Sequence, residues 1–212
     1  FSELGAGASA TITHFLSDKT TLGVGAFTEF GEFEDIFGTR HFTTSGLHGS
    51  VLYDGRDSSV EPTRGLYAAL DVKPFYEFQL SQPAVRAEAE MRAYVAVNEK
   101  ARTVLAGRVK TGSIVGPGIS QSPPSFLFNA GGGSSVRGYE FEGIGVINDR
   151  GQESGGKSLF EASLELRQRV YGNFGVVAFA DAGTVGTESL IDFSQDIKIY
   201  KKIMVGSEVT AM

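Results

Sequence analysis

The feature that most constrains the fold is a strict alternation of apolar and polar residues in segments of ten or more residues. In residues 85–97 the odd positions carry only Val, Ala and Met, while positions 86 to 94 carry Arg, Glu, Glu, Arg and Tyr in alternation. A helix would spread these charges around its circumference, whereas a strand places them on one face. The pattern therefore predicts a strand with one apolar and one charged face.

The same alternation predicts eight strands, joined mostly by short turns into an antiparallel meander. Several are longer than strands of globular sheets usually are, and near the ~9–11 residues that a tilted strand needs to cross a bilayer. The predicted strands cover residues 3–13, 20–33, 44–53, 65–75, 85–97, 102–111, 159–169 and 175–185.

The composition of the apolar faces predicts where they point. Small Ala and Val side chains, as in residues 85–97, would fill a water-excluding core poorly, but they can lie against lipid while the charged face lines a wet interior. No apolar run is long enough for a transmembrane helix. The sequence therefore predicts an all-β fold, a transmembrane antiparallel up-and-down β-barrel.

Composition also excludes several classes of function. The net charge of −6 and the lack of a Lys/Arg cluster argue against nucleic acid as a partner. The chain has no cysteine, and its three histidines show no close ligand spacing, so we expect no metal site. No nucleophile–base pair is recognisable, so we expect no enzymatic activity. The three histidines are His14, His41 and His48.

One long segment, residues 113–156, interrupts the meander. It is rich in Gly, Ser and Pro, yet it also carries several large apolar side chains close together, which indicates an ordered loop packed against the rest of the chain. These apolar residues are Phe126, Phe128, Val136, Tyr139 and Phe141. Residues 151–158 match the G-x-x-x-x-G-K-S phosphate-loop pattern, but a strand is predicted after them where that motif requires a helix, so we interpret the match as chance.

Two carboxylates on consecutive strands and an arginine in the loop form the most informative set of charges. Strand parity puts Glu165 and Asp181 on interior-facing positions, where Arg137 on an inward-folded loop could reach both. Spacing alone leaves open that the three charges are unrelated.

Four motifs, in order along the chain, resemble those of the BamA/TamA-type outer-membrane protein assembly factors. Residues 124–139, PSFLFNAGGGSSVRGY, are similar to the inward-folded sixth loop of that family, with its VRGY/F signature. Residues 53–57 (YDGRD) with 62–65 (PTRG) resemble a hairpin of the family. Residues 163–167 (SLELR) and 179–183 (FADAG) resemble the two strands after the loop. The form of the loop motif is nearer to TamA than to BamA.

The resemblance implies that residues 1–193 are a fragment of a sixteen-stranded barrel, with the loop at 113–156 folded into the lumen. Residues 194–212 do not align with the family's terminal strands and stay unassigned, and the family's POTRA repeats are absent from the sequence. Arg137 is expected to pair with Glu165 and Asp181, with Phe179 packing beside them. That contact would lock the loop signature in the lumen: Val136, Arg137, Gly138 and Tyr139.

The function implied by the resemblance is assembly and insertion of β-barrel proteins in the bacterial outer membrane, and of autotransporters in particular if the chain is TamA-like. The implied partners are unfolded outer-membrane protein or autotransporter clients, membrane lipid and a TamB-like periplasmic protein. The mechanism implied by the resemblance needs no cofactor and no nucleotide. One alternative is a two-partner secretion pore, which shares the loop motif but usually carries a plug helix and two POTRA repeats. Another is a passive porin, which would have an unobstructed lumen and no use for the three charges.

Overall fold

Nine long strands form one antiparallel sheet in which each strand pairs with its neighbours in chain order. This computed structural model describes residues 2–35, 38–147, 153–172, 174–191 and 197–206. The strands are β1 (Ser2–Ser17), β2 (Thr20–Asp35), β3 (Gly38–Asp54), β4 (Gly65–Glu77), β5 (Gln82–Ala96), β6 (Thr103–Val115), β9 (Ser158–Tyr171), β10 (Phe174–Gly186) and β11 (Lys198–Gly206).

The longest connection lies between β6 and β9. It contains two single-turn helices, η1 (Ile119–Gln121) and η2 (Pro124–Phe126), and a short hairpin made of β7 (Val146–Ile147) and β8 (Glu153–Ser154). Among the described residues, no helix is long and apolar enough to cross a membrane.

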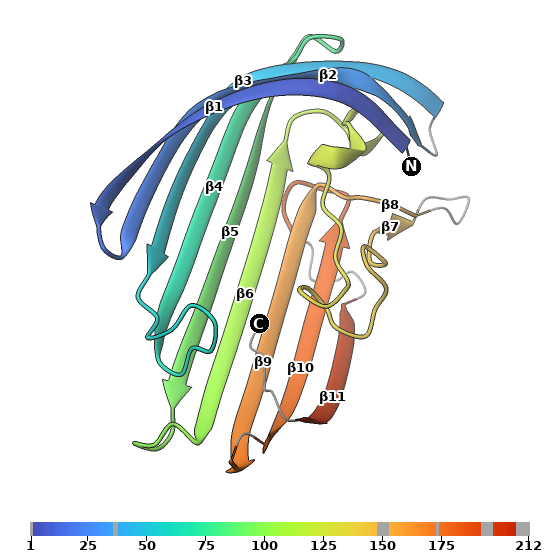
Figure 1. The fold of residues 1–212 in the computed structure, drawn as a ribbon. Helices are drawn as coiled ribbons and strands as arrows, with labels where there is room; N and C mark the ends of the chain where they lie inside the picture. The colour runs from blue at the N-terminus through green and yellow to red at the C-terminus, as the bar shows by residue number, and fades with distance from the viewer. Residues whose placement is uncertain (1, 36–37, 148–152, 173, 192–196, 207–212) are drawn as a thin grey trace.

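The sheet is strongly curved, and the β6–β9 connection lies on its concave side (Figure 1). β1 and β11 are its two edges, since within the described residues β1 pairs with β2 and β11 with β10, and neither pairs with the other. The curved sheet is therefore an open part of a barrel wall, and the loop occupies the space that the wall encloses.

The predicted all-β antiparallel fold is confirmed, and each of the eight predicted strands is present. The largest difference is at the start of β3, which begins at Gly38 because residues 38–43 continue to pair with β2. Phe42 is the one aliphatic or aromatic residue there, so the segment shows no alternation that could have been recognised. β11 lies within the segment 194–212, which sequence alone left unassigned; residues 194–196 and 207–212 are outside the described residues.

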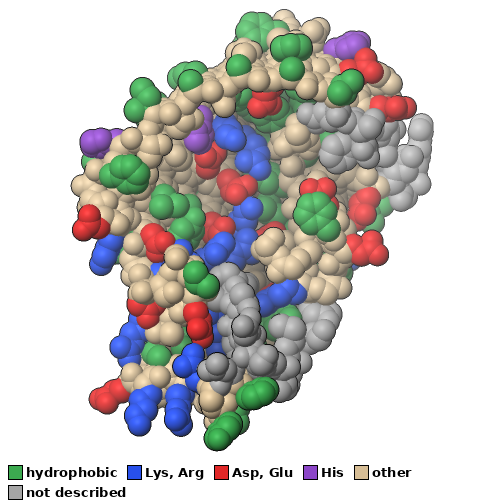
Figure 2. All heavy atoms as spheres, in the orientation of Figure 1, with side chains coloured by type: hydrophobic (Ala, Val, Ile, Leu, Met, Phe, Trp, Pro, Cys, Tyr) green, Lys and Arg blue, Asp and Glu red, His purple; other side chains and the backbone are tan. Residues whose placement is uncertain are grey.

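Charged side chains face the concave side of the sheet and apolar side chains face outward, the reverse of a water-soluble protein. On β9, Glu165 is buried inside the curve, whereas Leu164 and Leu166 point outward and are 61% and 44% exposed. On β5, Met91 and Val95 are likewise exposed. Figure 2 shows Lys, Arg, Asp and Glu side chains gathered in the hollow of the sheet. An apolar outer surface of this extent is stable against lipid rather than water, as in a membrane barrel.

A charge placed on the outer face tests this orientation. We expect Met91→Arg to lower the free energy of unfolding in lipid bilayers by about 2–4 kcal/mol, because an arginine near the middle of a lipid-facing strand is poorly solvated. Denaturant unfolding of the protein in lipid vesicles measures this change. The control is Glu99→Arg in the exposed turn after β5, for which we expect a change within about 0.5 kcal/mol. Equal small effects from both variants would mean that the outer face contacts water.

Candidate functional site

The β6–β9 loop is an ordered structure that satisfies many of its own backbone hydrogen bonds. Phe128 and Gly156 exchange two backbone hydrogen bonds of 2.9 and 2.8 Å, and Ala130 and Ile144 exchange two of 2.9 Å. Gly138, within the loop signature, has a φ of +94°, a left-handed conformation that glycine adopts without strain. Residues 148–152 of the predicted loop lie outside the described residues.

Arg137 projects from this loop onto the inner face of β9 and β10, where it meets both predicted carboxylates. Its Nε donates to Asp181 Oδ2 and its Nη2 to Asp181 Oδ1, each at 2.7 Å, and its Nη1 donates to Glu165 Oε1. The backbone N–H of Arg137 also donates to Asp181 Oδ2 at 3.0 Å. Asp181 therefore receives a bidentate, charge-assisted contact, which fixes the guanidinium in both position and plane.

The aromatic ring of Phe179 completes the contact. The guanidinium carbon of Arg137 lies 3.7 Å from the ring centroid, within the range of cation–π contacts. Phe179 lies directly opposite Glu165 in the register of β9 and β10, and Asp181 is the next inward position along β10. We refer to Arg137, Glu165, Phe179 and Asp181 as the arginine clamp.

Charge is balanced within the clamp once a second arginine is counted. Arg167, on β9, donates to the other oxygen of Glu165, Oε2, from Nε at 2.8 Å and from Nη2 at 2.6 Å. Two guanidinium groups thus face the two carboxylates of Glu165 and Asp181, all largely removed from solvent. A buried ionic cluster of this kind is costly to break, because removal of one member leaves its partner desolvated and unpaired.

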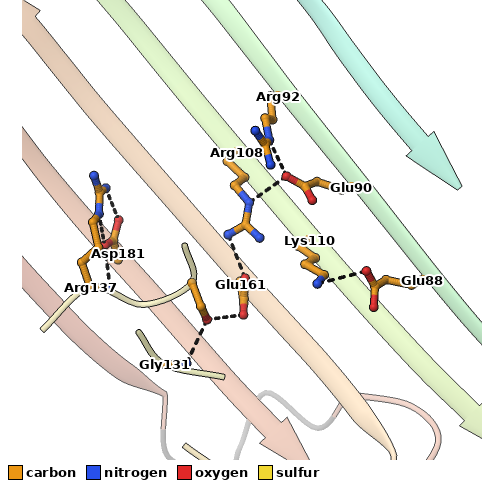
Figure 3. A network of polar contacts seen from close by, with 10 residues as sticks. Glu88, Glu90, Arg92, Arg108, Lys110, Gly131, Arg137, Glu161 and Asp181 are labelled. Carbon is orange, nitrogen blue, oxygen red and sulfur yellow. Dashed lines mark hydrogen bonds and ion pairs between the residues drawn. The ribbon is translucent and has the colours of Figure 1, made fainter. Parts of the chain in front are cut away.

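A second polar contact, two residues before Arg137, holds the same loop against β9 (Figure 3). The hydroxyl of Ser135 donates to Glu161 on β9, and Ser135 Oγ in turn accepts from the backbone N–H of Gly131 at 2.9 Å. Glu161 also accepts from Arg108 Nη1 at 2.8 Å, and Arg108 Nε donates to Glu90 at 2.8 Å. This contact continues around the wall through Arg92, which pairs with Glu90.

The start of the loop is held through aromatic residues. The ring of Phe126 lies 4.8 Å from that of Phe75, and Arg86 of β5 donates from Nε to the Phe126 carbonyl oxygen at 3.1 Å. The Arg86 guanidinium also lies 4.2 Å from the Phe128 ring centroid. Phe128 packs against Gly112 of β6, where any side chain would collide with its ring.

Apolar packing beneath the clamp involves Val136, which is fully buried. It belongs to a cluster contributed by the loop and by β6, β9 and β10: Ile114, Leu127, Phe128, Ala130, Val136, Ile144, Leu159 and Val185. Tyr139 packs at the edge of this cluster. Phe141, which the sequence suggested would pack with the other aromatic residues, is instead 80% exposed.

The hairpin of residues 54–65 lies at the end of the strands opposite the β6–β9 loop. Arg56 donates from Nε and Nη2 to the two oxygens of Asp54, each at 2.8 Å. Asp57 accepts from the Thr63 hydroxyl and from the backbone N–H groups of Thr63 and Arg64. Desolvation by neighbouring atoms acts to raise the pKa of Asp57, but these hydrogen bonds outweigh it and hold the pKa below its ordinary value.

The structure brings together all the charged residues that the sequence analysis singled out, and adds others that it did not assign to a site. Arg167, Glu161, Arg108 and Ser135 are the additions. Glu161 and Arg167 could have been found, since they share the inward parity of Glu165. Ser135 could not, because a loop has no periodicity that gives the direction of a side chain. The strand predicted after the phosphate-loop lookalike is confirmed as β9.

A glycine beneath Val136 allows a test of the packing that involves no charge. A Cβ at Gly183 would lie 2.5 Å from Cγ2 of Val136, whereas a Cβ at Gly107, on the outer face, meets nothing nearer than 3.9 Å. We expect Gly183→Ala to cost about 1–3 kcal/mol by overpacking and to make the loop accessible to protease. Gly107→Ala is the matched control, with a change within about 0.5 kcal/mol. Loop cleavage that is the same in both variants would contradict this account of the packing.

Comparison with known proteins gives two findings. Residues 4–207 match the family model described as the Omp85 superfamily domain. The fold is similar to the crystal structure of BamA from Haemophilus ducreyi lacking POTRA domains 1–3, with a TM-score of 0.72 and 18% sequence identity. That similarity covers 84% of this chain and 41% of the BamA chain, so the chain spans less than half of the structure it matches.

Proposed function

This chain belongs to the Omp85 superfamily, and we propose that it is part of the membrane barrel of a protein that folds and inserts β-barrel proteins into the bacterial outer membrane. Its predicted relation to the BamA/TamA-type assembly factors and its predicted barrel class are confirmed by the family match and by the fold. The observation that carries the functional proposal is the arginine clamp. It holds a long loop on the concave, charged face of a sheet whose outer face is apolar.

The clamp supports a mechanical role rather than a chemical one. Its carboxylates are occupied by guanidinium groups, and the members face one another rather than an open pocket. Among the residues described, no group of three or more His, Cys, Asp or Glu side chains could hold a metal ion. The clamp residues would fix the loop and brace the wall around it.

The proposed mechanism relies on the cost of unpaired backbone groups in lipid. An exposed strand edge in a barrel wall offers a row of N–H and C=O groups on which another strand can pair. A client strand added there gains hydrogen bonds that the bilayer cannot supply, and the client is then driven to complete its own barrel. A loop fixed inside the wall would keep the remaining strands in register while one edge opens.

The finer proposal is a TamA-like protein that acts on autotransporters with a TamB-like periplasmic partner. Its support is the sequence form of the loop, PSFLFNAGGGSSVRGY in residues 124–139. The lumen side of the wall argues against a passive porin, because the loop and its ion pairs occupy the space that diffusing solutes would need. The loop contacts themselves are equally compatible with a polypeptide-exporting pore, so client insertion has to be measured directly.

Removal of the clamp arginine tests the proposal. In the complete protein, we expect Arg137→Ala to destabilise the docked loop by about 3–5 kcal/mol, because Asp181 is left buried without its guanidinium partner. Insertion of a β-barrel client into lipid vesicles, followed by protease protection, should fall in parallel.

The control is Lys19→Gln in the exposed turn between β1 and β2, which should change neither loop stability nor insertion. Arg137→Lys keeps the charge but not the bidentate geometry, so we expect an intermediate loss. Equal effects of the variants at positions 137 and 19 would exclude the clamp from the function. A freed loop with unchanged insertion would exclude the assembly role while leaving the structural account intact.

A further inference from the structure

The hairpin of residues 54–65 contacts the wall far from its own strands. It joins β3 and β4, yet Arg64 Nη2 donates to the carbonyl oxygen of Asn98 in the turn between β5 and β6 at 3.4 Å. Glu61 pairs with Arg169 of β9 at 3.0 Å. Pro62, between these two contacts, is almost fully buried. The hairpin therefore reaches across the interior of the curved sheet toward β9.

Arg167 connects this hairpin to the clamp. Its Nη1 donates to the Pro62 carbonyl oxygen at 3.5 Å, near the upper limit for a hydrogen bond, while its Nε and Nη2 bind Oε2 of Glu165. The other oxygen of Glu165 receives Arg137. A single carboxylate thus joins an arginine that contacts the hairpin to the arginine that holds the loop.

The planar guanidinium of Arg167 fixes the positions of its N–H donors relative to one another. The five N–H donors of arginine lie in one plane, so a group that draws Nη1 out of line also tilts Nε and Nη2 away from Glu165. Arg167 is buried and lies 5.5 Å from the Tyr94 ring centroid, which limits the other positions that it can adopt. The Pro62 carbonyl and the Glu165 carboxylate therefore contact one and the same rigid group.

Several internal hydrogen bonds hold the hairpin of residues 54–65 together. Asp57 accepts three hydrogen bonds from Thr63 and Arg64, which closes the turn directly beside Pro62. The Asp57 backbone N–H also donates to the Arg64 carbonyl oxygen at 3.0 Å. Loss of Asp57 would remove the hydrogen bonds that fix Thr63 and Arg64, the two residues after Pro62.

We propose that Arg167 is a positioning residue that couples the hairpin of residues 54–65 to the inward-folded loop through Glu165. A shift in the position of the hairpin, at the end of the strands opposite the β6–β9 loop, would then loosen or tighten the contact of Arg137 with Glu165. This inference rests on the proposed role of the clamp in holding the loop.

A spin label on the loop measures this coupling. Residues 1–212 contain no cysteine, so Ser134→Cys adds one labelling site at an exposed position next to the loop signature, with any cysteine elsewhere in the complete protein replaced by serine. Electron paramagnetic resonance of the complete protein in lipid vesicles then reports the mobile fraction of the loop. We expect Asp57→Ala to raise that fraction about twofold or more when Arg167 is present, and to have no further effect in an Arg167→Met background, as for residues in one network.

Three further variants make the outcomes distinct. Glu61→Gln removes an exposed ion pair on the same hairpin and should leave the loop unchanged. Arg137→Ala should free the loop in every background, and a loop that stays immobile there would contradict the proposed function itself. Arg167→Lys keeps a charge near Glu165 without the planar fork, and it replaces Arg167→Met if that variant does not fold.

Two outcomes would overturn the coupling through Arg167. One is that the effects of Asp57→Ala and Arg167→Met on the mobile fraction are additive. The other is that Asp57→Ala has no effect although Arg137→Ala frees the loop. Non-additive effects that appear with Arg167→Met or with Arg167→Lys would support it.

Discussion

A guanidinium group removed from water has to meet carboxylates that are already in position, and the interior of this sheet is arranged around that requirement. Arg137 bridges Glu165 and Asp181 because these residues lie on adjacent strands, on the same face, one inward position apart. Arg167 supplies the second positive charge, so the cluster carries no net charge. Docking of the loop and the close packing of Val136 on Gly183 accompany this contact, which itself requires that both carboxylates face inward.

The same physical rule recurs farther round the wall. Glu161 and Glu90 share Arg108, Arg92 pairs with Glu90, and Lys110 pairs with Glu88 (Figure 3). Glu88 also pairs with Arg86. These groups are inside the curve, while Leu164, Leu166 and Met91 are on the outer surface. Such an arrangement is unfavourable in water, where apolar surface would be exposed, and favourable in a bilayer, where only the lumen remains wet. The orientation of the two faces therefore indicates that the outer surface of the sheet contacts lipid and its inner surface contacts water.

The strands and the clamp carboxylates could be predicted from the sequence because they depend on a periodicity of two. Once residues 159–169 and 175–185 are recognised as strands, the inward direction of Glu165 and Asp181 follows. What the sequence could not supply depends on contacts between distant segments. The start of β3 shows no alternation and is fixed by pairing with β2, and β11 is fixed by pairing with β10. The role of Ser135 and the reach of the hairpin to Arg167 depend on loop conformations that no local pattern encodes.

The division of the clamp between two strands has a consequence for the order of folding. Glu165 and Asp181 are brought to one site only when β9 and β10 pair in the observed register, with Glu165 opposite Phe179. A slip of one residue in either strand would turn its carboxylate toward the outside, and Arg137 would have no site to enter. Docking of the loop must therefore follow correct pairing of the two strands. Docking of Arg137 therefore distinguishes the observed register of β9 and β10 from one shifted by a single residue.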